Sequence, residues 1–395
     1  MARLYLDHAA TTPLDPAVLE AMLPWMGCDT GFGNPASVTH AYGRTAAAAV
    51  EQARRQVADL LQAPAEGVIF TGSATEAINM AVLGSMRFSM QRGRGSHLVT
   101  CATEHSAVLA ACEQLRREGA TITVLPVDAN GQLSLADLQE ALRDDTVLVS
   151  LMLGNNETGV CHDIAAVAAL LQGHPARLHV DATQAVGKVP VHLPALQADL
   201  LSLSAHKFHG PKGVGALWRC PEPRVRLQPL LFGGGQESGE RSGTQAVHQI
   251  VGLGEACGLA ANALPAEMQR LTALRDRLEA GLRATGIPMV CNGAGRRLPH
   301  ISNLSFPGLH GEALLADIEP ELAVALGSAC SSADARGSHV LRAMGLDETR
   351  SLSAFRLSVG RRTTPADIDV AVAVVARSAQ RLLRLSPLQP RGVAG

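Results

Sequence analysis

The chain has 395 residues, more than a single ordinary hydrophobic core accommodates, and we therefore expect a large domain and a smaller one. Hydrophobic residues make up 47% of the chain, and its net charge of −2, without long runs of one sign, excludes a surface specialised for nucleic-acid phosphates or anionic lipids. Because no stretch reaches about 18 uninterrupted apolar residues and the N-terminus lacks the apolar run of a signal peptide, we expect a cytoplasmic protein without a membrane span.

Apolar strand-like runs alternate with helical patterns in the first part of the chain. Strands are predicted over 67–71, 97–101, 121–127, 146–153, 177–182, 198–206 and 213–218, and helices over 44–62, 75–86, 107–118, 135–142 and 164–171. This alternation favours an α/β fold with a mainly parallel central sheet. Ligands of such sheets bind beyond the carboxyl ends of the strands.

The pattern changes after about residue 258. Helices are predicted over 265–285, 311–318 and 365–384, and short strands over 301–306. We therefore expect a large α/β domain over 15–258 and a small α+β domain formed by 1–14 and 259–395. The junction is predicted at 261–268, and the tail from Ser386 is predicted to be disordered.

The cysteines and lysines limit the kinds of active-site chemistry that the chain can support. The eight cysteines are scattered and none forms a CxxC pair, which argues against a zinc or dithiol site, and we expect no metal. Only three basic residues are lysines, and arginine cannot lose its proton to become a nucleophile. Lys207 directly follows an apolar strand, where a lysine of lowered pKa could hold pyridoxal phosphate (PLP) as a Schiff base. Lys188, in a predicted turn, and Lys212, between Pro and Gly, fit surface loops.

Asp181 ends the predicted strand 177–182 upstream of Lys207. PLP needs a carboxylate at its pyridine nitrogen, which keeps that nitrogen protonated, and Asp181 stands where such a group is needed. Gln184 could bond to the phenolate oxygen of the ring. The alternative is that Asp181 caps a helix.

Two further strand–helix turns carry candidate ligands. In the segment 70–81, backbone amides at Ala74 and Thr75 and the Thr75 hydroxyl would form an anion site for a phosphate. His105 lies between a strand and a helix, where an imidazole could stack on a cofactor ring and move protons. A purely structural histidine is the alternative.

Cys330 lies in a stretch rich in Gly, Ser and Ala, with Arg336 and His339 nearby. This composition is typical of a mobile loop. The thiolate of a cysteine in such a loop could attack sulfur, and the alternative is an incidental loop cysteine.

Together these segments resemble the cysteine desulfurases of the NifS/IscS type, which are PLP enzymes of the class V aminotransferase family. The resemblance covers nearly the whole chain, and its segments follow the family's order. They are YLDHAATTP (5–13), FGNPAS (32–37), TGSATEA (71–77), TEHSAV (103–108), GNNETG (154–159), HVDATQAVGK (179–188), SAHKFHGPKG (204–213), GGGQESGERSGT (233–244), GSACSS (327–332), SHVLRAMG (338–345) and RLSVGRRTT (356–364).

The resemblance implies the PLP-dependent transferase fold of type I and a homodimer. It implies conversion of L-cysteine to L-alanine, with the sulfur passing as a persulfide to Cys330 and then to an acceptor or iron–sulfur scaffold protein. Lys207, His105 and Cys330 would be catalytic. The implied cofactor ligands are Ala74, Thr75, His105, Asp181, Gln184, Ser204, His206, Lys207 and, from the other subunit, Thr244. The implied substrate ligands are Asn34, Asn156 and Arg356.

The sequence departs from the family at Ala335-Arg336-Gly337, where a hydrophobic–acidic–Pro stretch is common. A selenocysteine lyase or an aminotransferase of the same fold are alternatives, and an aminotransferase would not need Cys330. An inactive scaffold is a third alternative. The joint presence of the candidate site residues argues against it, and these are Lys207, Asp181, His105, Arg356 and Cys330. The sulfur acceptor stays open.

Overall fold

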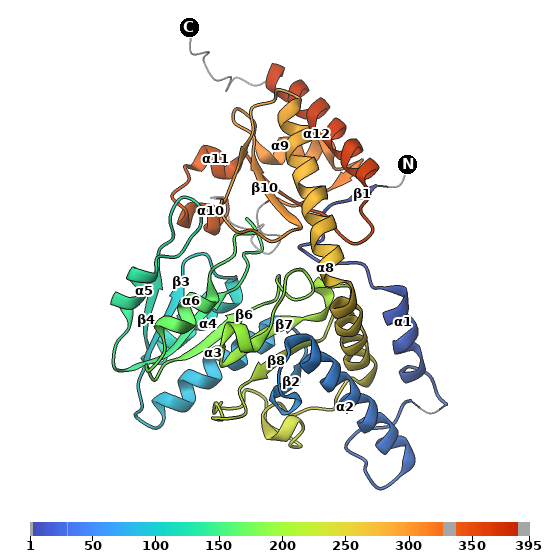
Figure 1. The fold of residues 1–395 in the computed structure, drawn as a ribbon, viewed down its shortest axis with the longest axis vertical. Coiled ribbons are helices and arrows are strands. Elements are labelled where there is room, and N and C mark those ends of the chain that lie inside the picture. The colour runs from blue at the N-terminus through green and yellow to red at the C-terminus, as the bar shows by residue number, and fades with distance from the viewer. Residues whose placement is uncertain (1–2, 30, 327–336, 386–395) are drawn as a thin grey trace.

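The computed structural model describes residues 3–29, 31–326 and 337–385. Its centre is a seven-stranded sheet in the order β2-β8-β7-β6-β5-β3-β4 (Figure 1). Neighbouring strands are parallel except for β8, which is antiparallel to β2 and β7. This confirms the predicted, mainly parallel sheet. The strands are β2 (Val68–Thr71), β3 (His97–Cys101), β4 (Thr121–Leu125), β5 (Thr146–Met152), β6 (Arg177–Asp181), β7 (Leu200–Ser204) and β8 (Gly215–Arg219).

Helices cover both faces of this sheet. Leu98 and Leu148 pack in the core with α3 and α4, whereas the adjacent Val99 and Val149 pack in the core with α2 and α6. Successive side chains of a strand point to opposite faces, so these apolar strands need a helical layer on each side. The helices are α1 (Pro16–Met22), α2 (Ala41–Leu61), α3 (Ala74–Met90), α4 (Ser106–Arg117), α5 (Leu135–Ala141), α6 (Ile164–Leu170) and α7 (Leu193–Leu196). The predicted elements are all present here, with ends that differ by a few residues.

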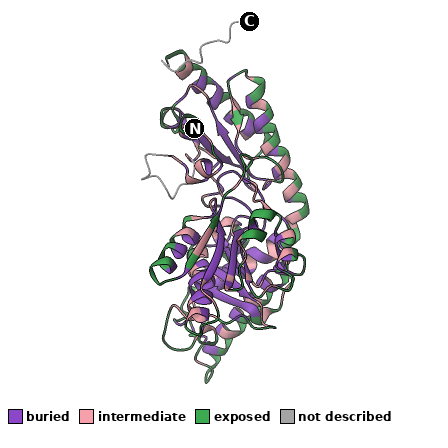
Figure 2. Cartoon of the chain, turned by 90° about the vertical axis from the view of Figure 1, so that its left-hand side faces the viewer, coloured by how far each residue is buried: buried purple, intermediate pink, exposed green. Residues whose placement is uncertain are grey.

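A second, smaller group of elements has its own core. An antiparallel sheet has the order β12-β10-β9, and β1 pairs with β11 in a separate parallel ribbon. Their core runs from Leu271 to Ala379 and includes Leu6 from the N-terminal segment. Figure 2 shows buried residues in both groups. The elements are β1 (Leu4–Tyr5), β9 (Val290–Cys291), β10 (Ile301–Ser305), α9 (Gly311–Ile318), β11 (Leu322–Ala323), α10 (His339–Ala343), α11 (Glu348–Leu352), β12 (Ala354–Ser358) and α12 (Pro365–Leu385).

One long helix, α8 (Val247–Ala284), connects the two groups (Figure 1). The helix predicted over 265–285 therefore begins much earlier, and the predicted junction 261–268 lies inside it, with Pro265. A proline costs a helix about 3 kcal/mol, but here both halves of the helix bury apolar faces, one in each core, which outweighs that loss. The division into 15–258 and 1–14 with 259–395 stays a prediction, because the core around the large sheet also includes Ala9, Leu298 and Ile301.

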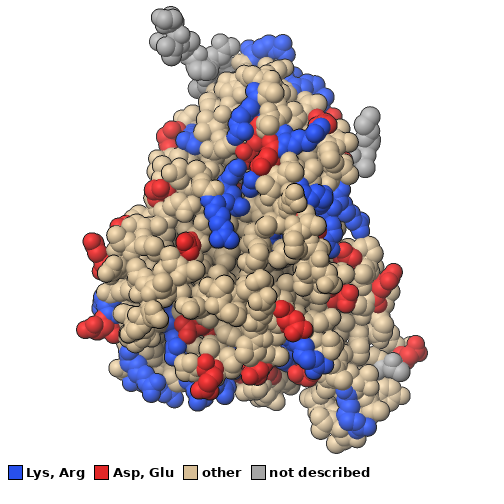
Figure 3. Space-filling view, viewed as in Figure 1, with Lys and Arg blue, Asp and Glu red and all other residues tan. Residues whose placement is uncertain are grey.

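The surface agrees with the small net charge. Acidic and basic side chains are both spread over the face seen in Figure 3. In the described part of the chain, no helix combines the length and the apolar character that a membrane span requires. The tail from Ser386, predicted to be disordered, lies outside the described residues.

Candidate active site

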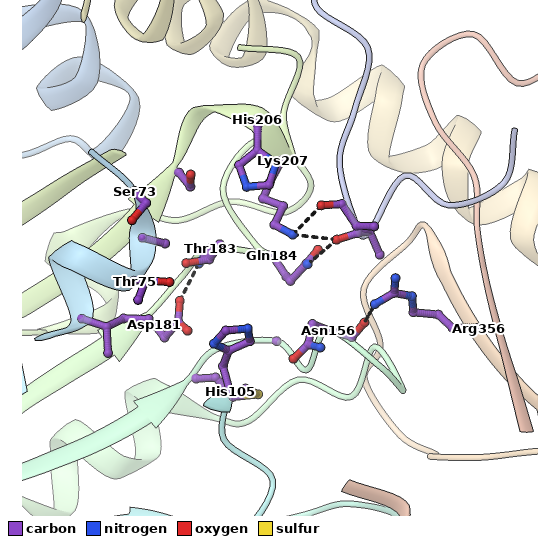
Figure 4. A pocket seen from close by; sticks show the side chains of 17 residues that line it. Ser73, Thr75, His105, Asn156, Asp181, Thr183, Gln184, His206, Lys207 and Arg356 are labelled. Atoms are coloured by element: carbon purple, nitrogen blue, oxygen red, sulfur yellow. Dashed lines mark hydrogen bonds between the residues drawn. The ribbon is translucent and has the colours of Figure 1, made fainter. Parts of the chain in front are cut away.

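A cavity opens at the carboxyl ends of β5, β6 and β7 (Figure 4). The strand register places Met152, the last residue of β5, beside Asp181, the last residue of β6. Most of the site residues predicted from the sequence line this cavity, as expected for the edge of a parallel sheet. They are Ala74, Thr75, His105, Asn156, Asp181, Gln184, Ser204, His206, Lys207 and Arg356.

Lys207 ends a short 3₁₀ turn that follows β7, and its amine reaches the N-terminal segment. Its Nζ donates to the carbonyl oxygens of Ala9 at 2.8 Å and Ala10 at 2.9 Å. The Ala9 carbonyl also accepts from Nε2 of Gln184 at 2.8 Å. Figure 4 shows these hydrogen bonds of Lys207 and Gln184 as dashed lines. The segment 7–12 therefore forms one wall of the site and orients the only lysine among the cavity-lining residues.

Asp181 supplies a buried carboxylate, only 5% exposed. Its Oδ1 accepts from the Thr183 amide at 2.9 Å, which fixes the carboxylate at the strand end. Helix α7 does not begin until Leu193, so the alternative reading of Asp181 as a helix cap is not supported. A fixed, buried carboxylate can keep a proton on a nearby ring nitrogen.

His105 is the N-cap of α4, and it also lines the cavity. Burial lowers its pKa below the ordinary value, the Asp181 carboxylate opposes this, and the Lys207 ammonium adds to it. Its Nδ1 accepts from the Ala107 amide at 3.1 Å, so the neutral ring carries its proton on Nε2. The structural reading of His105 is therefore confirmed by its position as the N-cap of α4, whereas its functional role stays a prediction.

The start of α3 is the candidate anion site. The Ser73 hydroxyl accepts from the Glu76 amide at 3.2 Å, which leaves the first amides of the helix, at Ala74 and Thr75, for a ligand. Gly215 of β8 packs closely there, because a Cβ on it would lie 2.7 Å from the Ser73 carbonyl carbon. The nearby hydroxyl of Ser204 also lines the cavity.

His206 stands on the same side of the cavity as Ser73 in Figure 4. Its Nδ1 lies 3.1 Å from the Thr11 hydroxyl. Burial lowers its pKa to about 4, with smaller contributions from the cations of Lys207 and Lys212. The ring is therefore neutral near pH 7 and acts as a hydrogen-bonding group.

The opposite end of the cavity carries Arg356, from β12, a strand that no sequence pattern predicted. The guanidinium is 2% exposed and lies 2.8 Å from the Asp7 carboxylate, while it donates to the Asn156 carbonyl at 3.0 Å. Its buried Nε has no partner among the described residues. A fixed guanidinium with an unused donor is suited to a carboxylate.

Two predicted residues, Asn34 and Thr244, do not line this cavity. Asn34 is exposed, and its side chain accepts from the Ala36 amide at 3.0 Å. Thr244 lines a separate hollow with Arg241 and Gln245. Cys330 lies outside the described residues, as does Arg336.

Some cavity residues had no assigned role in the sequence reading. Ala9 and Ala10 belong to YLDHAATTP, and Ser73 and Thr183 belong to the segments of Thr75 and Asp181. The sequence indicated these four residues only in that each lies in a segment that already contained a recognised motif. Asp7, which pairs with Arg356, belongs to the first of these segments.

The surface-loop interpretation is wrong for Lys188. The residue is in a turn, as predicted, but it is 2% exposed, because the rest of the fold covers this turn. Burial lowers its pKa to about 8, and Glu267 opposes this while Arg361 and Arg270 add to it. Lys212 is exposed, which confirms its interpretation.

The residues present fit PLP. The buried carboxylate of Asp181, the free helix amides at Ala74 and Thr75, and the Lys207 amine surround one cavity. They match the ring nitrogen, the phosphate and the aldehyde of that cofactor in chemical type.

Comparison with known proteins agrees with this chemistry. The model of the family "Aminotransferase class-V" matches residues 4–370. A "Cysteine desulfurase IscS" of Histophilus somni (strain 129Pt) is 47% identical over 385 residues, covering 98% of this chain and 95% of the relative. The protein of that name from Escherichia coli O139:H28 is 46% identical with the same coverage.

Solved structures are similar over most of the chain. A "NIFS-LIKE PROTEIN" has a TM-score of 0.88 and 34% identity, covering 96% of this chain and 99% of its own. A structure described as "SspA in complex with cysteine" has a TM-score of 0.80 and 33% identity, covering 91% of this chain and 99% of its own.

Proposed function

The chain belongs to the class-V aminotransferase family, and we propose that it is a PLP-dependent cysteine desulfurase that converts L-cysteine to L-alanine. The observation that carries this proposal is the cavity that brings Lys207 and Asp181 together with Arg356. The first two suit the cofactor and the third suits the carboxylate of an amino acid. The names of the relatives and the cysteine in the SspA structure support cysteine as the substrate.

When bound, PLP supplies a ring that accepts the electron pair left when the substrate loses its Cα proton. We propose that Asp181 faces the ring nitrogen, Gln184 the phenolate oxygen and His105 the ring face. The phosphate would be held by Ala74, Thr75, Ser204 and His206, and by Thr244 of the partner subunit. The chain would thus act as a homodimer with shared sites.

The substrate would be held by its carboxylate. Arg356 provides the charge, with Asn156 beside it, and we propose Asn34 as a further contact. Lys207 is the group whose amine can take the Cα proton, because it lies between the anion site and Arg356 in the cavity (Figure 4). We propose His105, whose neutral ring carries its proton on Nε2, as the acid–base group near the thiol of the substrate.

The sulfur would pass to Cys330. This assignment is inferred from the GSACSS segment of the sequence, because Cys330 lies outside the described part of the chain. The Cys330 thiolate attacks the substrate sulfur, the Cβ–S bond breaks, and an S–S bond forms. The substrate carbon skeleton gains protons in place of sulfur and leaves as alanine. The persulfide would then be passed to an acceptor protein, such as an iron–sulfur scaffold.

We place the enzyme in the cytoplasm as part of the same proposal. The described cysteines are free thiols, as in a reducing compartment. A persulfide carrier also needs such surroundings, because an oxidising compartment would convert its thiols to disulfides.

The test is incubation of the PLP-loaded enzyme with L-cysteine, with alanine and protein-bound persulfide measured together. We expect equal amounts of both in the first turnover. A parallel incubation of L-alanine with a 2-oxo acid tests for amino transfer. Amino transfer without persulfide would contradict the proposal and favour an aminotransferase.

A further inference from the structure

The turn that carries His105 is bonded to the end of the neighbouring strand. Glu104, the residue before His105, is 0% exposed, and its Oε1 accepts from the amide of Met152, the last residue of β5, at 2.7 Å. Nδ2 of Asn155 donates to the Thr103 carbonyl at 3.0 Å. Both contacts come from the large sheet and the turn that follows β5, so the sheet alone holds this turn from one side.

A further contact reaches the same turn from the smaller group of elements. Nε2 of His339, the first residue of α10, lies 3.0 Å from the Glu104 carbonyl oxygen. A carbonyl can only accept, so Nε2 carries the proton and donates it. The Glu104 carbonyl precedes α4, whose N-cap is His105. A side chain of the smaller group is thus bonded to the backbone directly beside His105.

The residue before His339 bonds a second active-site turn. The Ser338 hydroxyl accepts from the Leu341 amide at 3.2 Å, which caps α10, and it donates to Oε2 of the buried Glu157. The Glu157 amide in turn donates to Oδ1 of Asn155 at 2.9 Å. Asn155 therefore joins the turn of Glu157 to the turn of His105, and two adjacent residues of the smaller group are bonded to both.

Apolar packing and a defined turn fix the helix that carries His339. The side chains that pack around α10 are Val340, Leu341 and Met344, with Ala354 of β12 and Val127 of the chain after β4. Before the helix, Gly337 has φ of +78°, a left-handed conformation that favours glycine. The Gly337 carbonyl accepts from Nη1 of Arg342 at 2.7 Å. The start of α10 thus has a fixed place against both groups of elements.

We propose that His339 is a positioning residue for His105, acting through the Glu104 carbonyl. His105 lines the cavity, whereas His339 and Glu104 are not among the residues that line it, so they affect the reaction only through the turn. His339 is the ninth residue after Cys330, and α10 would therefore tie the chain that leads from the proposed nucleophile to the imidazole of His105. The positioning role rests on the proposed function, but the contact between α10 and the turn does not.

Substitutions of His339 test the positioning role by steady-state kinetics. His339→Leu removes the donor, so we expect kcat for alanine formation from L-cysteine to fall about tenfold, because small displacements of a reacting group cost rates of this order. KM should stay unchanged, since Arg356 keeps its contacts. His339→Gln should recover most of the rate, because its amide nitrogen still donates. The control is His310→Gln, since His310 is exposed and its side chain caps no helix. Equal losses in the Leu and Gln variants would overturn the role.

A double-variant cycle shows whether His339 acts through His105. Adding His339→Leu to His105→Gln should lower the remaining rate no further, because the imidazole that His339 positions is already gone. Independent contributions would instead multiply. Multiplied losses would therefore overturn the proposal.

Hydrogen exchange of the PLP-loaded enzyme, followed by mass spectrometry, gives a readout that does not depend on turnover. In His339→Leu the amides of residues 104–109 should exchange about tenfold faster than in the wild type, and those of α12 should not change. His339→Gln should behave like the wild type. Unchanged exchange over 104–109 in His339→Leu, or faster exchange throughout the chain, would overturn the role, since the second result would mean a general loss of packing.

Two further provisions separate the possible failures. If His339→Leu does not fold, His339→Asn takes its place, because its shorter side chain does not reach the Glu104 carbonyl, and the same outcomes apply. If the wild-type enzyme forms no alanine from L-cysteine, the proposed function fails, while hydrogen exchange still tests the contact between His339 and the turn of His105.

Discussion

The buried Arg356 guanidinium and the half-buried Asp7 carboxylate form an ion pair of 2.8 Å between residues at opposite ends of the chain. Asp7 therefore fixes the arginine before any substrate arrives, and the buried Nε of Arg356 has no partner among the described residues. This arrangement joins segment 7–12, which also contacts Lys207, to β12, the strand that carries Arg356, the proposed ligand of the substrate carboxylate. Segment 7–12 thus positions both Lys207 and Arg356 in the cavity.

Arg356→Lys should raise KM for L-cysteine at least about tenfold, because an ammonium cannot hold Asp7, the Asn156 carbonyl and a carboxylate in the guanidinium geometry. PLP binding should persist. Steady-state kinetics of alanine formation measure the change, with Arg277→Lys, an exposed ion-pair arginine, as the control. An unchanged KM would show that the substrate carboxylate is held elsewhere. Arg356→Gln should also destabilise the fold by about 3 kcal/mol, since it leaves Asp7 unpaired.

Lys207→Ala should lose turnover and the covalent link to PLP. The amine is the only one among the cavity-lining side chains, since Lys188 is buried behind the site and Lys212 is exposed. Borohydride reduction followed by peptide mass spectrometry measures the link, with Lys212→Ala as the control. A reduced PLP adduct that persists in Lys207→Ala would refute the assignment.

Cys330→Ser should still bind PLP and L-cysteine but carry no substrate-derived sulfur, because neither binding step uses the thiol. Incubation with ³⁵S-labelled L-cysteine and non-reducing gel analysis measure the bound sulfur. The matched control is Cys28→Ser, since Cys28 is an exposed free thiol. Retention of label in Cys330→Ser would identify another cysteine as the acceptor.

Thr244→Ala should weaken PLP binding in a way that mixed dimers can restore. Within one chain Thr244 lies away from the cavity, so its proposed ligand is in the partner subunit. A heterodimer of Thr244→Ala and Lys207→Ala subunits should regain one intact site and about half of the wild-type activity, although each parent is impaired. Activity no higher than that of the parents would contradict the shared site.

Stability should fall as the pH drops from about 6.5 towards 4. Burial lowers the pKa of His8, His162 and His179 to about 4, so these rings stay neutral in the folded state while the unfolded chain takes up protons below about 6.5. Each contributes up to about 1.4 kcal/mol per pH unit in that window. Urea unfolding at pH 7.5, 6 and 5 measures the slope, and the exposed His310→Gln is the control. A flat profile from pH 7 to 5 would disprove the prediction.

Much of the site could be predicted because its residues lie at strand ends and strand–helix turns, and these local patterns determine where a side chain lies in a parallel sheet. Asp181 and Lys207 follow apolar runs, and Thr75 and His105 lie where such runs pass into helices. The carboxyl ends of parallel strands meet at one edge of a sheet, so residues far apart in sequence converge without any knowledge of the packing. The mainly parallel sheet itself follows from the alternation of strand and helix patterns.

Other features depended on contacts between distant segments. The ion pair of Arg356 with Asp7, the continuation of α8 through Pro265 and the burial of Lys188 each require a partner surface that no local pattern encodes. Lys188 is the clearest case, because its turn was read correctly while its exposure was not. Turn chemistry depends on a few neighbouring residues, whereas burial depends on which segments the rest of the chain packs over them, and only the tertiary structure decides that.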